Sequence, residues 1–219
     1  MRERFIKDGL DNFEAVNALE LLLFYCLPRK DTNEIAHHLL TAFGSLAGVL
    51  EAKPEDLAKV EGVGQSAAVY LSLIGAVNRL YQESKAANVS IVKSIEDCYH
   101  ILRPKFSGRR DERIYLICLD AKSKIICTKL ISEGSVNTTA ISIRKIMETS
   151  LSVNASGVIL AHNHPSGLAL PSAEDVYTTK RIAETLQNVD VIMYDHLIFG
   201  DDEFISMKQS GLFCPDGVV

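Results

Sequence analysis

Two histidines at the end of an apolar run place the strongest constraint on this chain. The run Gly157–Ala161 is short and wholly apolar, which is typical of a buried central strand, and His162 and His164 follow it. Side chains alternate along a strand, so these two point the same way. Ser172 then begins a helical pattern whose first turn carries Asp175. A loop that folds the chain back can bring the Asp175 carboxylate to the two imidazoles.

These three side chains have the chemistry of a zinc site. Imidazole nitrogens and carboxylate oxygens are common zinc ligands, and three protein ligands leave a fourth position open, as in catalytic sites. Water in that position has a pKa lowered toward neutrality. The sequence therefore predicts Zn²⁺ bound by His162, His164 and Asp175. The alternative is a chance pair of histidines beside an ordinary helix cap. Ser172 is compatible with both, because one hydroxyl can cap the helix and face the pocket.

The hydrophobic patterns predict two domains and an α+β fold. Residues 1–85 are expected to be all helical, residues 86–93 to be a small, polar linker, and residues 94–219 to form a mixed sheet flanked by helices. Strands are expected over 113–120, 125–132, 157–161, 189–194, 197–200 and 204–207. Helices of this second domain are expected over 94–102, 138–152 and 173–187.

Composition excludes several classes of protein. Apolar residues make up 47% and charged residues 23% of 219 residues, which is ordinary for a globular protein. The formal net charge of −5 argues against a general nucleic-acid binder. No apolar stretch is long enough to predict a membrane span. The five cysteines are scattered, and the N-terminus has no apolar signal core, so a cytoplasmic protein with reduced thiols is expected.

Two features suggest contact with an anionic partner. Gly62-Val63-Gly64 lies between two helical patterns, as in a helix-hairpin-helix module, where glycines let the backbone approach a DNA phosphate. Against this, residues 1–85 hold nine Lys and Arg but twelve Asp and Glu. A hairpin that only packs, or binds a protein, is the alternative. The basic cluster over 103–113 is interpreted as a solvated loop.

The pattern His-x-His, seven residues, Ser-x-x-Asp resembles the motif of the JAMM/MPN+ metalloproteases. The longer string His162-Asn163-His164-Pro165-Ser166-Gly167, with Pro171-Ser172 and Asp175, resembles the RadC (UPF0758) family. Nearly the whole chain shares this resemblance, including the hairpin glycines and the segments 20–22, 195–198 and 206–211. It implies a cytidine-deaminase-like JAMM/MPN fold after the helical domain. One departure is Ile143-Arg144-Lys145, where such sequences often have Pro-Arg-Glu.

The resemblance also implies roles for single residues. His162, His164 and Asp175 would hold zinc. Glu112, at the start of an early strand, would act as general base and then as proton donor to the leaving amine, and Ser172 would stabilise the oxyanion. Glu133 and Glu148 are the other candidates for the base. Asp195-His196 is interpreted as a structural or supporting pair rather than a further ligand.

The function implied is a zinc metallopeptidase or isopeptidase that hydrolyses an amide bond of a peptide or protein with zinc-bound water. Two alternatives remain open at this point. One is a DNA-repair-associated factor or nuclease that contacts DNA through Gly62, Val63 and Gly64. The other is a catalytically silent interaction module. The oligomeric state is left open.

Overall fold

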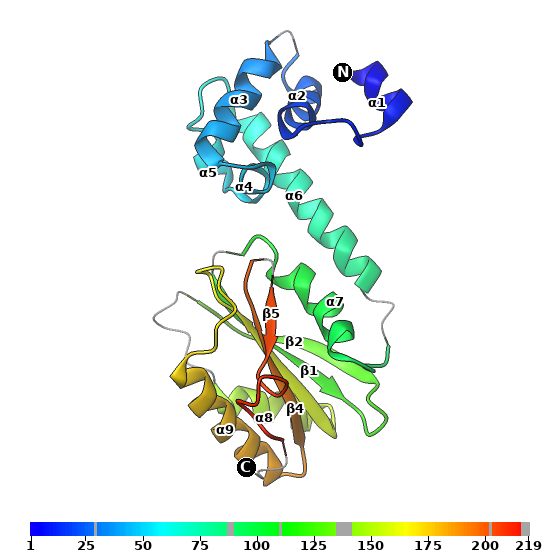
Figure 1. Cartoon of the computed structure of the whole chain (residues 1–219), viewed down its shortest axis with the longest axis vertical. Coiled ribbons are helices and arrows are strands. Elements are labelled where there is room, and N and C mark those ends of the chain that lie inside the picture. Colours follow the sequence, from blue (N-terminus) through cyan, green and yellow to red (C-terminus); the bar gives the residue numbers. More distant parts are fainter. Residues whose placement is uncertain (29, 87–89, 110, 135–141, 202, 216–219) are drawn as a thin grey trace. The chain divides into compact units, whose positions relative to one another are not determined.

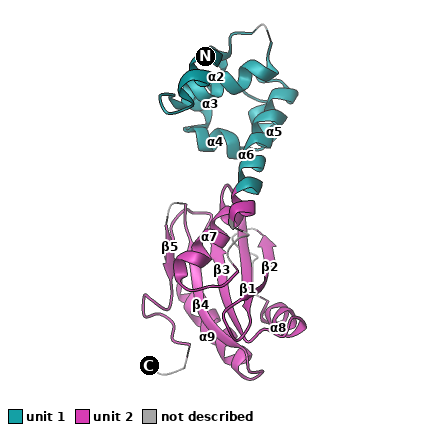
Figure 2. Ribbon diagram, turned by 90° about the vertical axis from the view of Figure 1, so that its right-hand side faces the viewer, with its two compact units in different colours: residues 1–81 teal, residues 82–219 magenta. Residues whose placement is uncertain are grey.

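The computed structural model describes residues 1–28, 30–86, 90–109, 111–134, 142–201 and 203–215. The chain divides into two compact units, residues 1–81 and 82–219 (Figures 1 and 2). The boundary lies within helix α6 (Gln65–Ala86). Residues 87–89 of the expected linker lie outside the described residues, so the linker itself stays a prediction.

The first unit is helical, as expected. Besides α6 it contains α1 (Arg2–Asp8), α2 (Ala15–Cys26), α3 (Thr32–Phe43), α4 (Leu46–Glu51) and α5 (Pro54–Leu57). Side-chain oxygens cap the N-termini of α3 and α4: Asp31 accepts a hydrogen bond from the backbone N–H of Asn33, and Ser45 accepts one from the backbone N–H of Gly48. The core of this unit is formed by fully buried leucines of α2, α3, α5 and α6, namely Leu19, Leu23, Leu39, Leu57 and Leu71.

In the turn before α6, packing explains why one of the hairpin positions is a glycine. Gly62 has φ +85°, and a Cβ placed there would lie 2.7 Å from Cγ1 of Ile35, so only glycine fits. A pocket of about 250 Å³ beside this turn is lined by the acidic residues Asp31, Glu34 and Glu61 and also by Lys30 and His38. The three carboxylates outnumber the one lysine, which is unfavourable for a phosphate group. Contact of this hairpin with DNA stays an untested prediction.

The second unit is a five-stranded mixed sheet with helices on both faces (Figure 1). Its elements are α7 (Ile95–Phe106), β1 (Glu112–Leu119), β2 (Ile125–Gly134), α8 (Ile143–Ser152), β3 (Gly157–Asn163), α9 (Ala173–Gln187), β4 (Ile192–Phe199) and β5 (Phe204–Ser206). The strand order is β2-β1-β3-β4-β5. Among the described strands, only β3 and β4 pair in parallel, with α9 as their crossover. The predicted α+β fold class is confirmed.

Alternation along the strands divides the apolar side chains between two cores. Leu116, Leu160 and Ile198 face α8 and α9, where they pack with Ile146 and Ile182. The neighbouring positions in these strands face α7. This alternation decides the position of the site, because every second residue of β3 faces α9.

The other core lies between the sheet and α7. It is built from apolar residues of β1, β3 and β4 packed against one side of that helix, namely Cys98, Ile101, Leu102, Phe106, Ile117, Leu119, Ile159, Ala161, Leu197 and Phe199. Covered in this way on both faces, β3 is buried along its whole length. The wholly apolar run in the sequence predicted this central position.

Several expected boundaries were wrong. The two strands predicted over 189–194 and 197–200 are one strand, β4, because Asp195 and His196 are buried within the sheet rather than exposed in a turn. Helix α7 continues through Pro104 to Phe106, so Arg103 and Lys105 of the basic cluster lie on a helix and not in a loop. Helix α8 begins after the cap Ser142, and the first residues predicted for it lie outside the described residues.

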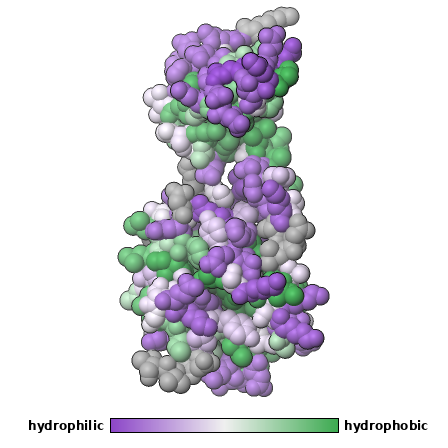
Figure 3. Space-filling model, turned by 45° about the vertical axis from the view of Figure 1, so that its right-hand side comes forward, coloured by the Kyte–Doolittle hydropathy of each residue, from purple (hydrophilic) through white to green (hydrophobic). Residues whose placement is uncertain are grey.

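Apolar side chains also reach the surface in both units, as separate hydrophobic areas among hydrophilic ones (Figure 3). Within α6, for example, Leu73 is 53% and Val77 is 52% exposed. Among the described helices, none combines the length and apolar character needed to span a membrane.

Candidate metal centre

The two histidines of the motif lie where β3 ends. His162 is the last but one residue of β3 and is 1% exposed, with its ring on the α9 face of the sheet. His164 follows the strand, and its backbone N–H donates to the carbonyl oxygen of Phe199 over 2.9 Å, which extends the β3–β4 pairing by one residue. Both histidines are therefore placed at the same end of β3, and their Nε2 atoms lie 2.9 Å apart.

The first turn of α9 brings Asp175 to the same point. Ser172 caps this helix: its Oγ accepts from the backbone N–H of Asp175 over 3.1 Å, and its own N–H donates to Asp175 Oδ2 over 2.8 Å. Asp175 Oδ1 lies 3.3 Å from His162 Nε2, and Oδ2 lies 3.6 Å from His164 Nε2. One ligand atom from each of the three residues falls within 4.8 Å of the others. The predicted ligand set thus meets in space.

A chain of hydrogen bonds fixes which nitrogen of His162 is free to bind a metal. Thr179 Oγ1 donates to the carbonyl oxygen of Asp175 over 2.5 Å, so it accepts from His196 Nδ1 at 2.6 Å. The Nε2 atom of neutral His196 then has a lone pair and accepts from His162 Nδ1 at 2.8 Å. This assignment rests on the bonding pattern. It leaves a lone pair on His162 Nε2, directed at the cluster.

His164 is oriented in the same sense by a backbone carbonyl. Its Nδ1 lies 3.0 Å from the carbonyl oxygen of Leu168, which can only accept. The hydrogen is therefore on Nδ1, and the lone pair of the neutral ring is on Nε2. Metal-binding histidines commonly donate their second N–H in this way, which fixes the ring and the tautomer. Both histidines thus present Nε2 to the same point.

Burial and neighbouring charges set the protonation states of these three side chains in the metal-free protein. Burial lowers the pKa of His162 to about 4, so its ring is neutral at pH 7. A hydrogen bond to Asp175 raises the pKa of His164 above its ordinary value, against the opposing effect of burial. Burial alone would raise the pKa of Asp175, but His164, His162 and Ser172 together outweigh it and hold that pKa well below its usual range. Asp175 is therefore ionised.

Glu112 lies beside the cluster. It begins β1, whose antiparallel register with β3 places Ile114 opposite His162. The side-chain amide of Asn163, on the other face, holds the two strand ends together: its Oδ1 accepts from the backbone N–H of Arg113 over 2.8 Å. Burial raises the pKa of Glu112, and the nearby charge of His164 partly opposes this. A carboxyl group of raised pKa next to a cation site is suited to proton transfer.

The other candidates for a base have partners elsewhere. Glu133 in β2 forms an ion pair with Arg113. Glu148 in α8 forms an exposed ion pair with Arg144, 2.7 Å apart. Ser172, predicted to contact the oxyanion, stands at the edge of the cluster, and its hydroxyl donates to Asp175 Oδ2 over 2.5 Å. The Ser172 hydroxyl must release its hydrogen bond to Asp175 before it can donate to a substrate oxygen.

Of the residues that support the cluster, the sequence indicated only His196. His196 was interpreted as structural or supporting, and the structure places it in contact with His162. Thr179 and the carbonyl group of Leu168 were missed. Neither has a local signal, since each depends on how α9 and the loop pack. The spacing Asp175-x3-Thr179, one helical turn, was the only available hint.

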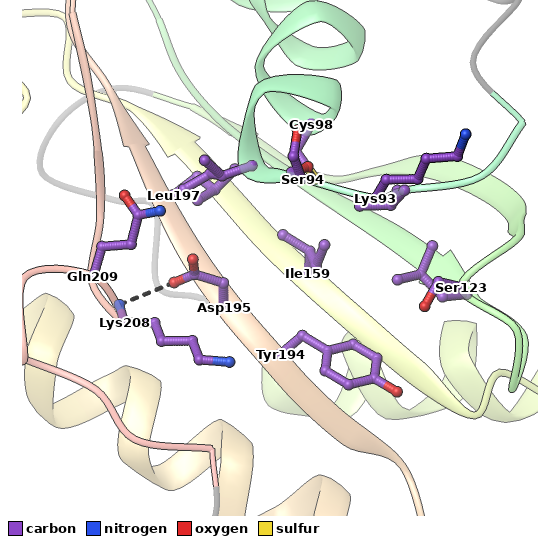
Figure 4. A pocket seen from close by; sticks show the side chains of 13 residues that line it. Lys93, Ser94, Cys98, Ser123, Ile159, Tyr194, Asp195, Leu197, Lys208 and Gln209 are labelled. Atoms are coloured by element: carbon purple, nitrogen blue, oxygen red, sulfur yellow. Dashed lines mark hydrogen bonds between the residues drawn. The ribbon is translucent and has the colours of Figure 1, made fainter.

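Asp195, the neighbour of His196, faces away from the cluster. It lines a pocket of about 500 Å³ on the α7 side of the sheet (Figure 4). Its carboxylate accepts from Ser206 Oγ at 2.5 Å and from the backbone N–H groups of His196 and Lys208 at 2.7 and 3.0 Å. Burial raises the pKa of Asp195, and these bonds oppose the rise. Its role is to join β4 to the segment after β5.

Comparisons with known proteins match the motif. The model of the RadC-like JAB domain family matches residues 92–212. UPF0758 proteins of Fusobacterium nucleatum and Carboxydothermus hydrogenoformans are each 32% identical to this chain, over 97% of it and 94% of their own length. A UPF0758 protein of Rhodobacter capsulatus is 31% identical, over 97% of this chain and 99% of its own length. The resemblance drawn from the motif is confirmed. The UPF0758 name states no activity.

Proposed function

Because this chain belongs to the UPF0758 (RadC) family and carries a RadC-like JAB domain, we propose that it is a zinc-dependent hydrolase that cleaves an amide bond in a peptide or protein. One observation carries the proposal. His162, His164 and Asp175 meet with their ligand atoms within 4.8 Å, and both histidines present an Nε2 lone pair. A cluster that only stabilised the fold would not need this common orientation.

The donor set fits zinc. Two neutral imidazole nitrogens and one carboxylate oxygen are a ligand set of catalytic zinc sites, whereas Ca²⁺ and Mg²⁺ prefer oxygen ligands. His162, His164 and Asp175 would hold the ion. Bound zinc would lower the pKa of a water molecule toward 7 and so supply hydroxide at neutral pH.

The remaining steps belong to residues of the chain. Glu112, at the start of β1, accepts the proton of the attacking water and then donates it to the leaving amine. Its raised pKa favours this second step. Ser172 donates its hydroxyl hydrogen to the oxygen of the tetrahedral intermediate. It would become able to do so if Asp175, while holding a cation, accepted this bond less strongly.

The test combines metal analysis with a cleavage screen. Purified wild type is expected to hold one zinc per chain, and the His162→Ala/His164→Ala variant is expected to hold none. Glu112→Gln is expected to keep zinc and lose cleavage of a proteome-derived peptide library. Full zinc occupancy in the double variant would remove the ligand assignment. Turnover by Glu112→Gln would remove the base assignment, and zinc without cleavage in wild type would favour an interaction module.

A further inference from the structure

Two exposed leucines lie in the loop between the metal-binding histidines and α9. Leu168 is 64% and Leu170 is 70% exposed, whereas Ala169 between them is 1% exposed. The segment therefore turns one side to the protein and its two large apolar side chains to the solvent. Single exposed leucines are common, but two on one short segment form a local apolar surface.

The loop is held in place at its base. Gly167, with φ +84°, donates its N–H to the carbonyl oxygen of His164 over 3.0 Å and accepts from the N–H of Asp201 over 3.0 Å. Gly200 allows a close approach, because a Cβ there would lie 2.3 Å from the carbonyl oxygen of Gly167 and 2.9 Å from the nitrogen of Ala169. The leucines are thus presented on a braced backbone.

The same loop is bonded directly to the cluster. The carbonyl oxygen of Leu168 accepts from His164 Nδ1 at 3.0 Å, and Leu170 is two residues before Ser172. Because this loop joins His164 to the helix that carries Asp175, residues next to an amide held at the cluster can contact it.

We infer that Leu168 and Leu170 are specificity-determining residues that receive an apolar side chain next to the cleaved amide bond. The substrates are then peptides or proteins with an apolar residue beside that bond. The inference rests on the proposed function, because it assumes that a peptide amide reaches His162, His164 and Asp175. An apolar side chain placed on two leucines removes surface from water on both partners, and this favours binding.

The test uses the zinc-loaded full chain and a proteome-derived peptide library. Cleaved bonds are expected to be enriched in apolar flanking residues. A synthetic copy of the best-cleaved peptide is then compared across variants. Leu168→Ser/Leu170→Ser is expected to raise KM about 10- to 100-fold, with kcat nearly unchanged and zinc retained. Leu151→Ser is the matched control, because Leu151 is 48% exposed and lies in α8. This helix leads into the start of β3 at Gly157, the end of the strand opposite His162.

A binding arm separates this inference from the proposed function. Zinc-loaded Glu112→Gln, with and without the two serines, is offered the same library, and retained peptides are identified. If apolar peptides are retained and their retention depends on the leucines, the inference is supported even if wild type cleaves nothing. The lack of cleavage would overturn the proposed function alone. Cleavage without apolar preference, or an unchanged KM, overturns the inference alone. If neither cleavage nor retention is observed, both the inference and the proposed function are overturned. If wild type is a dimer and Leu168→Ser/Leu170→Ser abolishes the dimer, a second copy covers the leucines and the inference is overturned.

Discussion

Thr179 illustrates how one hydroxyl group can set the chemistry of a proposed metal ligand that it does not touch. It contacts His196, and His196 contacts His162. Without the acceptor at Oγ1, the Nδ1 hydrogen of His196 loses its partner, and the ring is free to take the other tautomer. Its Nε2 would then carry a hydrogen facing His162 Nδ1, and His162 would have to rotate or change tautomer.

We therefore expect Thr179→Val to weaken zinc binding about 10- to 100-fold without unfolding the protein. The measurement is zinc affinity by competition with a chelator. Thr185→Val is the matched control, because Thr185 makes the same bond to the carbonyl four residues earlier, 2.7 Å long, but is only partly buried and makes no described hydrogen bond to a histidine. Equal affinity in the two variants would contradict the proposed bonding chain.

Zinc affinity should also depend on pH through His164. Its pKa is raised by Asp175, so without metal a proton occupies this ring below that raised value and competes with zinc. His162, with a pKa of about 4, adds no competition until far lower pH. We expect affinity to fall about tenfold per pH unit once His164 is protonated. Titration calorimetry in buffers of different ionisation enthalpy should show about one proton released per zinc near pH 6.

The pKa shifts of His164 and Asp175 make the stability of the metal-free protein depend on pH in opposite directions. The raised pKa of His164 means that its protonated form stabilises the fold below its unfolded pKa, and this contribution is lost as pH rises through the folded value. The lowered pKa of Asp175 stabilises the fold above its unfolded pKa, and this contribution is lost in strong acid. Urea unfolding from pH 3 to 8 should show both effects in wild type and neither in a His164→Ala/Asp175→Asn variant.

The residues predicted from sequence were those with a local signature. His162, His164 and Asp175 follow from a strand period and a helix cap, and family resemblance added Glu112. The supporting contacts depend on long-range packing: His196 reaches His162 only because β4 pairs with β3 in parallel, with a register irregularity between Val158 and Ile159. No pattern within either segment specifies that register.

Secondary-structure elements were predicted well where one principle acted alone. Helix α9 begins at its cap and ends as its apolar period predicts. Strand β4 was predicted as two strands because Asp195 and His196 interrupt an apolar run. Their polar groups are bonded by Ser206, Lys208 and Thr179, which the strand itself does not reveal. Buried polar groups are tolerated when they are bonded, and only the folded neighbourhood shows that they are.

At the hairpin before α6, backbone conformation and packing lead to a clear expectation. Gly62→Ala forces a side chain into the positive-φ region and against Ile35, so it should destabilise the protein by about 1–3 kcal/mol. Gly64→Ala is the control, since a Cβ there has nothing within 4 Å, and its effect should stay within about 0.5 kcal/mol. Urea unfolding measures both. If Gly62→Ala were as stable as wild type, the packing explanation for this glycine would fail.

For the whole molecule, the separate cores predict two unfolding transitions. The described core of the first unit lies between Leu19 and Leu71, whereas the two cores of the second lie between Cys98 and Phe213. All three proposed ligands belong to the second unit. Zinc at 100 times its dissociation constant should stabilise that unit by about 2.7 kcal/mol. Calorimetry should show the second transition move upward with zinc while the first does not, and a joint shift would contradict this.

The parallel pairing of β3 with β4 also sets an order of events during synthesis. His162 and His164 leave the ribosome before the helix that carries Asp175, and His196 follows His162 by 34 positions in the chain. At about 5 to 20 residues per second, this delay is about 2 to 7 s. During that interval the first helical unit, with its local contacts, has time to fold. His196 can orient His162 only after β4 docks, so we expect loading with metal to be among the last steps in the maturation of the protein.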